Sequence, residues 1–269
     1  MDLGISTFAF AWAIGVEGQV PEHPMTAMDF VKKAKFLGLD RVQFGDNLPL
    51  HLLQEDELQQ LSDFSKQENI KVEVGTRGLL YNHVQIYLKI SEQFGSPFLR
   101  IVIDDKNYQP DINEVVETVK KLLPSLRKKN IKLAIENHDR FKALEFVEIV
   151  ERTDPEWVGI CLDPINSLGA DQSIGEILLD LAPYTFNLHI KDYSIKRKWH
   201  NMGFDTIGTP AGKGLMPIKK IFEILELHKK CYSASLELWP APKENIEETV
   251  IIEARWVEES IFYLKSLLS

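Results

Sequence analysis

Short apolar runs alternate with longer amphipathic runs along the whole chain. The short runs show no clean alternation of apolar and polar positions, which is typical of parallel strands buried on both faces. We predict eight such strands, at residues 3–10, 41–44, 72–75, 98–103, 132–135, 158–162, 186–190 and 233–238.

The amphipathic runs between these segments predict helices. The clearest covers residues 112–126, where apolar side chains recur at i, i+3, i+4 and i+7, and Pro124 is expected to kink or end it. The last begins at Asn245, which forms with Glu248 a pattern close to a capping box. Other helices are expected near residues 25–37, 54–68, 82–94, 144–151, 174–181 and 217–228.

Eight strands, each followed by a helix, predict the fold class. Right-handed crossovers connect such units most simply when the strands close into a single (β/α)8 TIM barrel, and the usual size of that barrel matches the 269 residues. We therefore expect one α/β domain over residues 1–269, with an open doubly wound sheet as the structural alternative. A barrel requires catalytic residues at the C-terminal ends of its strands.

Composition narrows the classes of partner. Hydrophobic residues make up 44% of the chain and charged residues 26%, as in ordinary soluble proteins. The net charge of −9 disfavours nucleic acids and anionic membranes as partners. Cys161 and Cys231 form no disulfide framework or zinc motif, which indicates a cytoplasmic location. The apolar run at residues 8–16 is too short to span a bilayer and follows no basic segment, so we predict no export signal.

Ionisable side chains stand at the ends of the last four predicted strands. Glu136, Asp163, His189 and Glu237 would converge at one mouth of a barrel. Three carboxylates and one imidazole form a hard site that favours Mn²⁺ or Mg²⁺, with Co²⁺ or Zn²⁺ as alternatives. The clustered carboxylates would repel each other unless a divalent cation lay among them. Alternatively, such carboxylates cap helices or pair with arginines, and the histidine is an ordinary polar residue.

These residues resemble the xylose isomerase-like barrels, and within them the sugar phosphate isomerase/epimerase family. The matching stretches are AIENH at 134–138, GICLD at 159–163 followed by Asn166, LHIKD at 188–192 and LE at 236–237. The resemblance implies that Glu136, Asp163, His189 and Glu237 are metal ligands. It also implies an enzyme that acts on a ketose or related hydroxy-ketone through a metal-stabilised enediolate. Glu136 and Glu237 would be the catalytic acid/base pair.

Two departures from the resemblance bear on the reaction. The ketose 3-epimerase branch has His three positions after the metal Asp and Arg six positions after the metal His. This chain has Asn166 and Ile195 there. The stretch around His189 is more similar to the inosose dehydratase and hydroxypyruvate isomerase branches. A metal-dependent lyase or dehydratase is therefore the main alternative to an isomerase or epimerase.

Further residues near the predicted strand ends are candidates for substrate binding. Lys191 could neutralise an enolate, although a solvated pair with Asp192 is as reasonable. Arg77 could bind a carboxylate or phosphate, or form an internal salt bridge. Trp12 could form an apolar wall for a sugar or belong to the core. His138 and Asn166 complete this set, with a hydrogen-bonding role at a helix start as the alternative for His138.

Two other function classes share parts of this pattern. An endonuclease IV-type nuclease needs additional His and Asp ligands, and both the charge of −9 and Asn166 count against it. A non-catalytic sugar-binding protein would not require ionisable residues on four strands. We expect a small carbohydrate as the partner, and the sequence leaves a homo-oligomer open.

Overall fold

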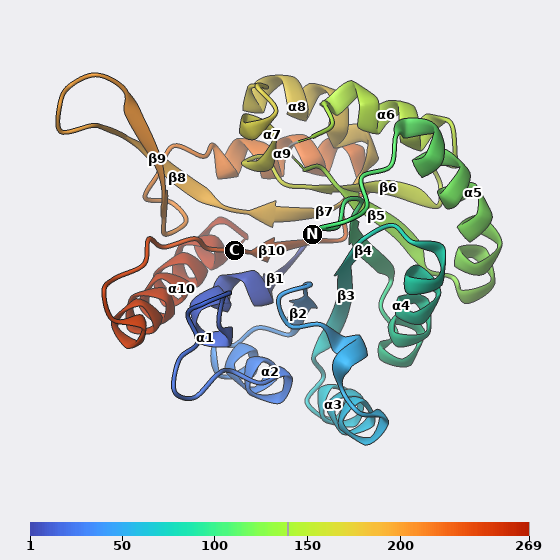
Figure 1. Ribbon diagram of the computed structural model, residues 1–269, viewed down its shortest axis with the longest axis horizontal. Helices are drawn as coiled ribbons and strands as arrows, with labels where there is room; N and C mark the ends of the chain where they lie inside the picture. The colour runs from blue at the N-terminus through green and yellow to red at the C-terminus, as the bar shows by residue number, and fades with distance from the viewer. Residues whose placement is uncertain (139, 269) are drawn as a thin grey trace.

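Eight parallel strands close into a barrel in the computed structural model, which describes residues 1–138 and 140–268 (Figure 1). Around the barrel the order is β1, β10, β7, β6, β5, β4, β3, β2. The predicted (β/α)8 TIM barrel is therefore confirmed. The strands are β1 Asp2–Ser6, β2 Arg41–Phe44, β3 Lys71–Arg77, β4 Phe98–Val102, β5 Lys132–Glu136, β6 Val158–Leu162, β7 Thr185–Ile190 and β10 Ser233–Leu236.

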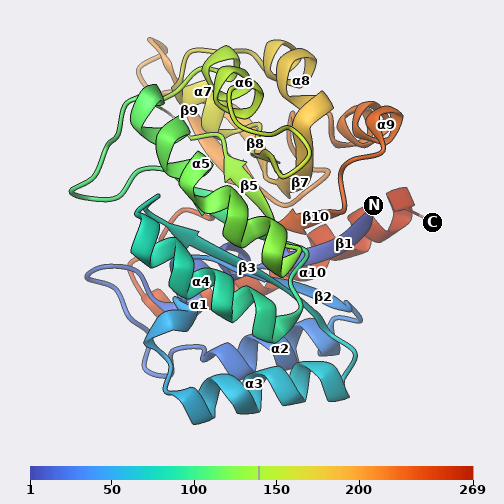
Figure 2. The ribbon, with the colours of Figure 1, turned by 90° about the vertical axis from the view of Figure 1, so that its right-hand side faces the viewer.

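Helices cover the outside of the barrel (Figures 1 and 2). The long ones are α2 Ala27–Phe36, α3 Glu55–Gln67, α4 Tyr81–Phe94, α5 Ile112–Lys129, α6 Ala143–Glu151, α8 Ile174–Leu181, α9 Ile218–His228 and α10 Ile246–Leu268. Short turns of helix are α1 Ala11–Ile14 and α7 Asn166–Gly169, with 3-10 turns at Thr7–Phe10, Leu50–Leu52 and Ala182–Tyr184. Each long helix buries one apolar stripe against the strands, as the 3.6-residue pattern predicts.

Helix α5 shows how local sequence sets the bounds of an element. The Asp111 side chain accepts a hydrogen bond from the Glu114 backbone amide at the start, and Asn130 ends the helix in the left-handed conformation. Pro124 lies inside α5, so the expectation that it ends the helix is wrong. Its side chain is on the exposed face, where water can satisfy the carbonyl that loses its partner.

An additional antiparallel hairpin follows β7. It consists of β8 Asp192–Arg197 and β9 Phe204–Thr209, and it projects beyond the barrel (Figure 1). The apolar pattern of the sequence does not predict this hairpin, because much of it is polar and exposed. Its base adjoins the C-terminal mouth of the barrel, and β9 contributes to the wall of the cavity there.

The inside of the barrel is partly polar, whereas TIM barrels are usually filled by branched apolar side chains. Buried Glu73 of β3 pairs with Arg41 of β2, with 2.8 Å between Oε1 and Nη1. Gln43 and Asn187 lie between this pair and the C-terminal mouth, joined to it through hydrogen bonds. The candidate site therefore rests on a hydrogen-bonded floor.

Candidate active site

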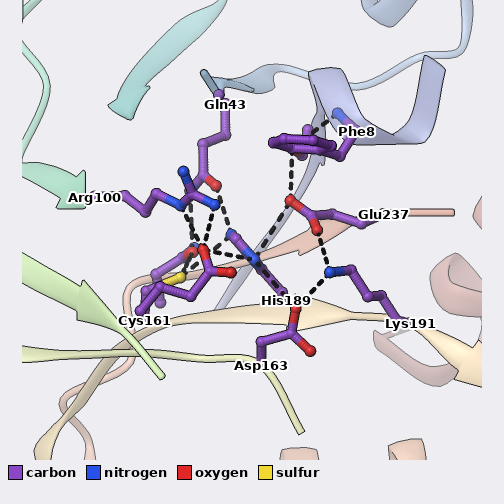
Figure 3. A network of polar contacts seen from close by, with 12 residues as sticks. Phe8, Gln43, Arg100, Cys161, Asp163, His189, Lys191 and Glu237 are labelled. Atoms are coloured by element: carbon purple, nitrogen blue, oxygen red, sulfur yellow. Dashed lines mark hydrogen bonds and ion pairs between the residues drawn. The ribbon is translucent and has the colours of Figure 1, made fainter. Parts of the chain in front are cut away.

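The four predicted metal ligands lie together at the C-terminal mouth of the barrel. Glu136 ends β5, His189 is in β7, and Asp163 and Glu237 directly follow β6 and β10. All four are buried. The His189 Nδ1 atom is 3.3 Å from Glu237 Oε1, 3.5 Å from Glu136 Oε2 and 3.8 Å from Asp163 Oδ2 (Figure 3). The sequence thus identified four side chains that the fold brings to one point.

The donor atoms of this cluster fit a divalent cation. Among the described residues, His189 Nδ1 is buried and has no hydrogen-bond partner. The other ring nitrogen, Nε2, lies 2.6 Å from Gln43 Oε1. Asp163, His189 and Glu237 each offer one ligand atom, all within 4.8 Å of one another. An imidazole nitrogen among carboxylate oxygens is a suitable set for Mn²⁺ or Mg²⁺ once the nitrogen has released its proton.

Two cations of the chain itself also bind these carboxylates. Arg100 of β4 donates from Nε to Glu136 Oε2 at 2.5 Å, and a second nitrogen of its guanidinium contacts the same oxygen. Lys191 Nζ lies 2.6 Å from Asp163 Oδ2 and 2.9 Å from Glu237 Oε2 (Figure 3). Two positive charges of the chain therefore offset the three carboxylates in part, and Arg100 corresponds to the pairing with arginine that the sequence left open.

Charge and burial compete in setting the protonation of these groups. Burial acts to raise the pKa of Asp163, but Lys191 and His189 outweigh it and lower that pKa. The pKa of Glu237 is lowered for the same reasons. Burial acts to lower the pKa of Lys191, and the neighbouring carboxylates raise it instead. Asp163, Glu237 and Lys191 are therefore all ionised at neutral pH.

Neutral donors complete the environment of the two predicted catalytic glutamates. Asn166 Nδ2 donates to Glu136 Oε1 at 2.9 Å, and Ser6 Oγ donates to Glu237 Oε1 at 2.8 Å. With Arg100 and Lys191, every carboxylate oxygen of Glu136 and Glu237 has a donor from the chain. Arg100 and Ser6 are not among the site residues predicted from the sequence. A charged residue inside the apolar strand FLRIV was the available signal for Arg100.

A cavity of about 810 Å³ opens beside the cluster. Its lining includes three of the residues predicted to bind substrate, which are Lys191, Asn166 and Trp12. Most of the other lining side chains are apolar. Arg77 and His138 are outside this lining. Arg77 donates instead from Nε to Asp46 Oδ2 at 2.9 Å, which corresponds to the internal salt bridge left open from the sequence.

Comparison with known proteins assigns the family. A family model described as xylose isomerase-like TIM barrel matches residues 31–265, which is most of the chain. The chain belongs to this family. The resemblance inferred from the strand-end residues is thereby confirmed.

Relatives of this xylose isomerase-like barrel include enzymes. A 3-oxo-isoapionate decarboxylase from Pectobacterium atrosepticum is 28% identical over 98% of this chain and 95% of its own length. A D-psicose 3-epimerase structure from Clostridium cellulolyticum, with D-tagatose, matches with a TM-score of 0.76 at 15% identity and full coverage of both chains. A xylose isomerase-like protein from Mycobacterium smegmatis in complex with magnesium matches with a TM-score of 0.69 at 14% identity and 97% coverage of both.

Asp192 does not lie in solvent beside Lys191. In this xylose isomerase-like barrel it is buried and accepts hydrogen bonds from four backbone amides. Oδ2 accepts from Gly212 and Gly214, both at 2.9 Å, while Oδ1 accepts from Tyr193 and Met216 at 2.8 and 3.0 Å. The interpretation of Lys191 and Asp192 as a solvated charge pair is therefore wrong. Asp192 orders the loop after β9 at the cavity mouth.

Among the described residues, no helix combines the length and the apolar character needed to cross a bilayer.

Proposed function

We propose that this chain is an enzyme that forms an enediolate from a small polyhydroxylated keto compound, with a divalent metal held by Glu136, Asp163, His189 and Glu237. The observation that carries the proposal is the buried Nδ1 atom of His189, which has no hydrogen-bond partner among the described residues and faces three carboxylates next to the cavity. A metal bound there supplies Lewis-acid polarisation of a carbonyl and its neighbouring hydroxyl. Mn²⁺ or Mg²⁺ suits the oxygen-rich set best, and Co²⁺ or Zn²⁺ are the alternatives.

Lys191 is the charged side chain that the chain itself presents to the substrate. Its ammonium group lies at the cavity wall and contacts Asp163 and Glu237. A fixed positive charge beside the reacting carbon stabilises negative charge that develops on a substrate oxygen. Glu237, 2.9 Å from Lys191 Nζ, is placed to exchange a proton with it.

The surroundings of Glu136 favour a lyase over a 3-epimerase. Epimerisation needs two groups that give and take a proton on opposite faces of one carbon. Both oxygens of Glu136 accept from donors that keep their protons, the guanidinium of Arg100 and the amide of Asn166. Glu237 also has a donor on each oxygen, but one of them is the Lys191 ammonium, which can give up a proton. Glu136 is therefore suited to holding a metal, and Glu237 to proton transfer.

Decarboxylation of a 3-oxo acid needs only one proton transfer. The bond between the carboxylate carbon and the adjacent carbon breaks, CO₂ leaves, and the bonding electron pair forms the enolate. One proton then passes from Lys191 at the cavity wall to the enolate carbon and gives the ketone, and a proton from water restores Lys191 by way of Glu237. The relative named as 3-oxo-isoapionate decarboxylase supports this choice. A sugar isomerase or epimerase stays the second candidate, which the D-psicose 3-epimerase fold favours.

The test is incubation with 3-oxo sugar acids and with ketoses in D₂O, followed by NMR. Release of CO₂ with one deuterium at the new C–H position supports the lyase. Solvent deuterium and a changed configuration without CO₂ release support the epimerase. If neither reaction is observed, with or without Mn²⁺, the result contradicts the proposed function.

A variant pair tests the assigned residue. We expect Glu237→Gln to lower turnover by about 10²-fold or more, the usual contribution of acid–base catalysis. Glu244→Gln, at an exposed position on the loop that follows β10, is the matched control and should retain full turnover. Unchanged turnover in Glu237→Gln would refute the role of Glu237.

A further inference from the structure

A chain of hydrogen bonds crosses the barrel beneath the candidate metal ligands. Asn187 Nδ2 donates to the Ser233 backbone carbonyl at 3.1 Å. Gln43 Nε2 donates to Asn187 Oδ1 at 3.0 Å, and Gln43 Oε1 lies 2.6 Å from His189 Nε2 (Figure 3). Gln43 comes from β2 and His189 from β7, so the contact spans the barrel interior.

The direction of every hydrogen bond in this series follows from the first one, between Asn187 and the Ser233 carbonyl. A backbone carbonyl can only accept, so the amino group of Asn187 must face Ser233. The carbonyl oxygen of Asn187 then faces Gln43, whose amino group must donate to it. The remaining polar atom of Gln43, Oε1, can only accept. His189 must therefore donate from Nε2, because an unprotonated nitrogen at 2.6 Å would face an oxygen with no hydrogen between them.

A second anchor fixes the same orientation of Gln43. Its Nε2 atom also donates to Glu73 Oε2 at 3.1 Å. Glu73 accepts from Arg41 Nη1 at 2.8 Å and from Ser233 Oγ at 2.5 Å. A flip of the Gln43 amide would set its oxygen against Asn187 Oδ1 and would remove the amide donor from Glu73 Oε2.

We infer that Gln43 is a positioning residue that holds His189 with its proton on Nε2 and its lone pair on Nδ1, aimed at the carboxylate cluster. Residues that hydrogen-bond the far nitrogen of a ligating histidine fix its tautomer and ring orientation. The link to metal binding rests on the proposed function, whereas the tautomer is a property of the protein alone.

The first experiment reads the tautomer in the wild-type chain. Protein with ¹⁵N-labelled imidazoles is studied by NMR from pH 7 to 10 without metal, and again with Mg²⁺, with the His189 signals assigned by their loss in His189→Asn. We expect Nδ1 to lose its proton first and Nε2 to keep its proton in both states. A neutral ring protonated on Nδ1 would overturn the inference.

The second experiment measures Mn²⁺ affinity by electron paramagnetic resonance. Gln43→Met keeps the side-chain length but removes the acceptor, and we expect Kd to rise by about 10- to 100-fold. Ser235→Ala is the matched control, because Ser235 is buried on β10 opposite His189 in the strand register and its Oγ has no partner among the described residues. We expect its Kd to stay within about twofold of wild type.

The two measurements separate the inference from the proposed function. An unchanged Kd in Gln43→Met would overturn the inference while leaving the metal site intact. A wild-type chain that binds no Mn²⁺ would contradict the proposed function, and the metal-free NMR result would still decide the tautomer. If Gln43→Met does not fold, the wild-type NMR spectra decide the question alone.

Discussion

Glu253 supports one wall of the candidate site from the outer layer of the barrel. It is a fully buried residue of α10, and its Oε1 and Oε2 accept hydrogen bonds from the backbone amides of Trp12 and Ala13, both at 2.9 Å. Trp12 lines the cavity. Burial raises the pKa of Glu253 to about 7, even though the two amide donors act to lower it.

This raised pKa predicts a loss of stability with rising pH. The ordinary pKa of the side chain, and hence of the unfolded chain, is 4.5. Between pH 4.5 and about 7 the native state therefore binds the proton more tightly than the unfolded state, and the free energy of unfolding falls as the pH rises. A difference of about 2.5 pKa units corresponds to about 3 kcal/mol in total, of which about 2 kcal/mol is lost between pH 5.5 and 8.5.

The assay is urea unfolding of the wild type and of Glu253→Gln at pH 5.5 and 8.5. The variant cannot titrate at this position, so subtracting it removes the contribution of other groups. From pH 5.5 to 8.5 we expect the free energy of unfolding of the wild type to fall by about 2 kcal/mol more than that of the variant. Glu248→Gln, at an exposed position of the same helix, should behave like the wild type. If the free energies of unfolding of the wild type and Glu253→Gln differ by the same amount at both pH values, the reasoning is refuted.

Three further outcomes follow from the charges of the site. Arg100→Met leaves Glu136 buried without its cation and should lower the free energy of unfolding by about 3–5 kcal/mol in urea titrations; a loss below about 1 kcal/mol would contradict the ion pair. Lys191→Met should lower turnover by at least about 10²-fold while tightening Mn²⁺ binding, because Asp163 and Glu237 lose a competing cation; weaker binding would count against this. Mn²⁺ at a hundred times its Kd should stabilise the wild type by about 2.7 kcal/mol, reversibly with a chelator, and no shift in the melting temperature would contradict the metal site.

The strands could be predicted closely because barrel strands are covered on both faces and therefore read as continuous apolar runs. Arg41–Phe44 and Val158–Leu162 match the predicted bounds of 41–44 and 158–162. The first strand is shorter than the predicted range of 3–10. Ser6 accepts a hydrogen bond from the Phe8 amide and starts a 3-10 turn, while the apolar pattern continues without a break. Periodicity cannot mark an end where both conformations bury their side chains.

The site was predictable to the extent that strand order alone determines it. Glu136, Asp163, His189 and Glu237 follow from being at the ends of neighbouring strands. Some partners of these residues come from across the barrel, as with Gln43, which is 146 positions from His189. Such contacts depend on register and on side-chain direction through the barrel, and no local spacing in the sequence encodes them.

The two cations of the site differ in their freedom to act on a substrate. Arg100 is held from two sides, because its Nη1 is 3.1 Å from Asp46 Oδ1 while the rest of the guanidinium binds Glu136. Asp46 is in turn fixed by Arg77. Although burial acts to raise the pKa of Asp46, Arg100 and Arg77 outweigh it and keep that pKa low. A guanidinium between two carboxylates cannot turn toward the cavity without leaving one of them buried and unpaired. Lys191 is also held between two carboxylates, Asp163 and Glu237, but it already lines the cavity. It is therefore the cation that can act on a charge developing on the substrate without leaving its partners.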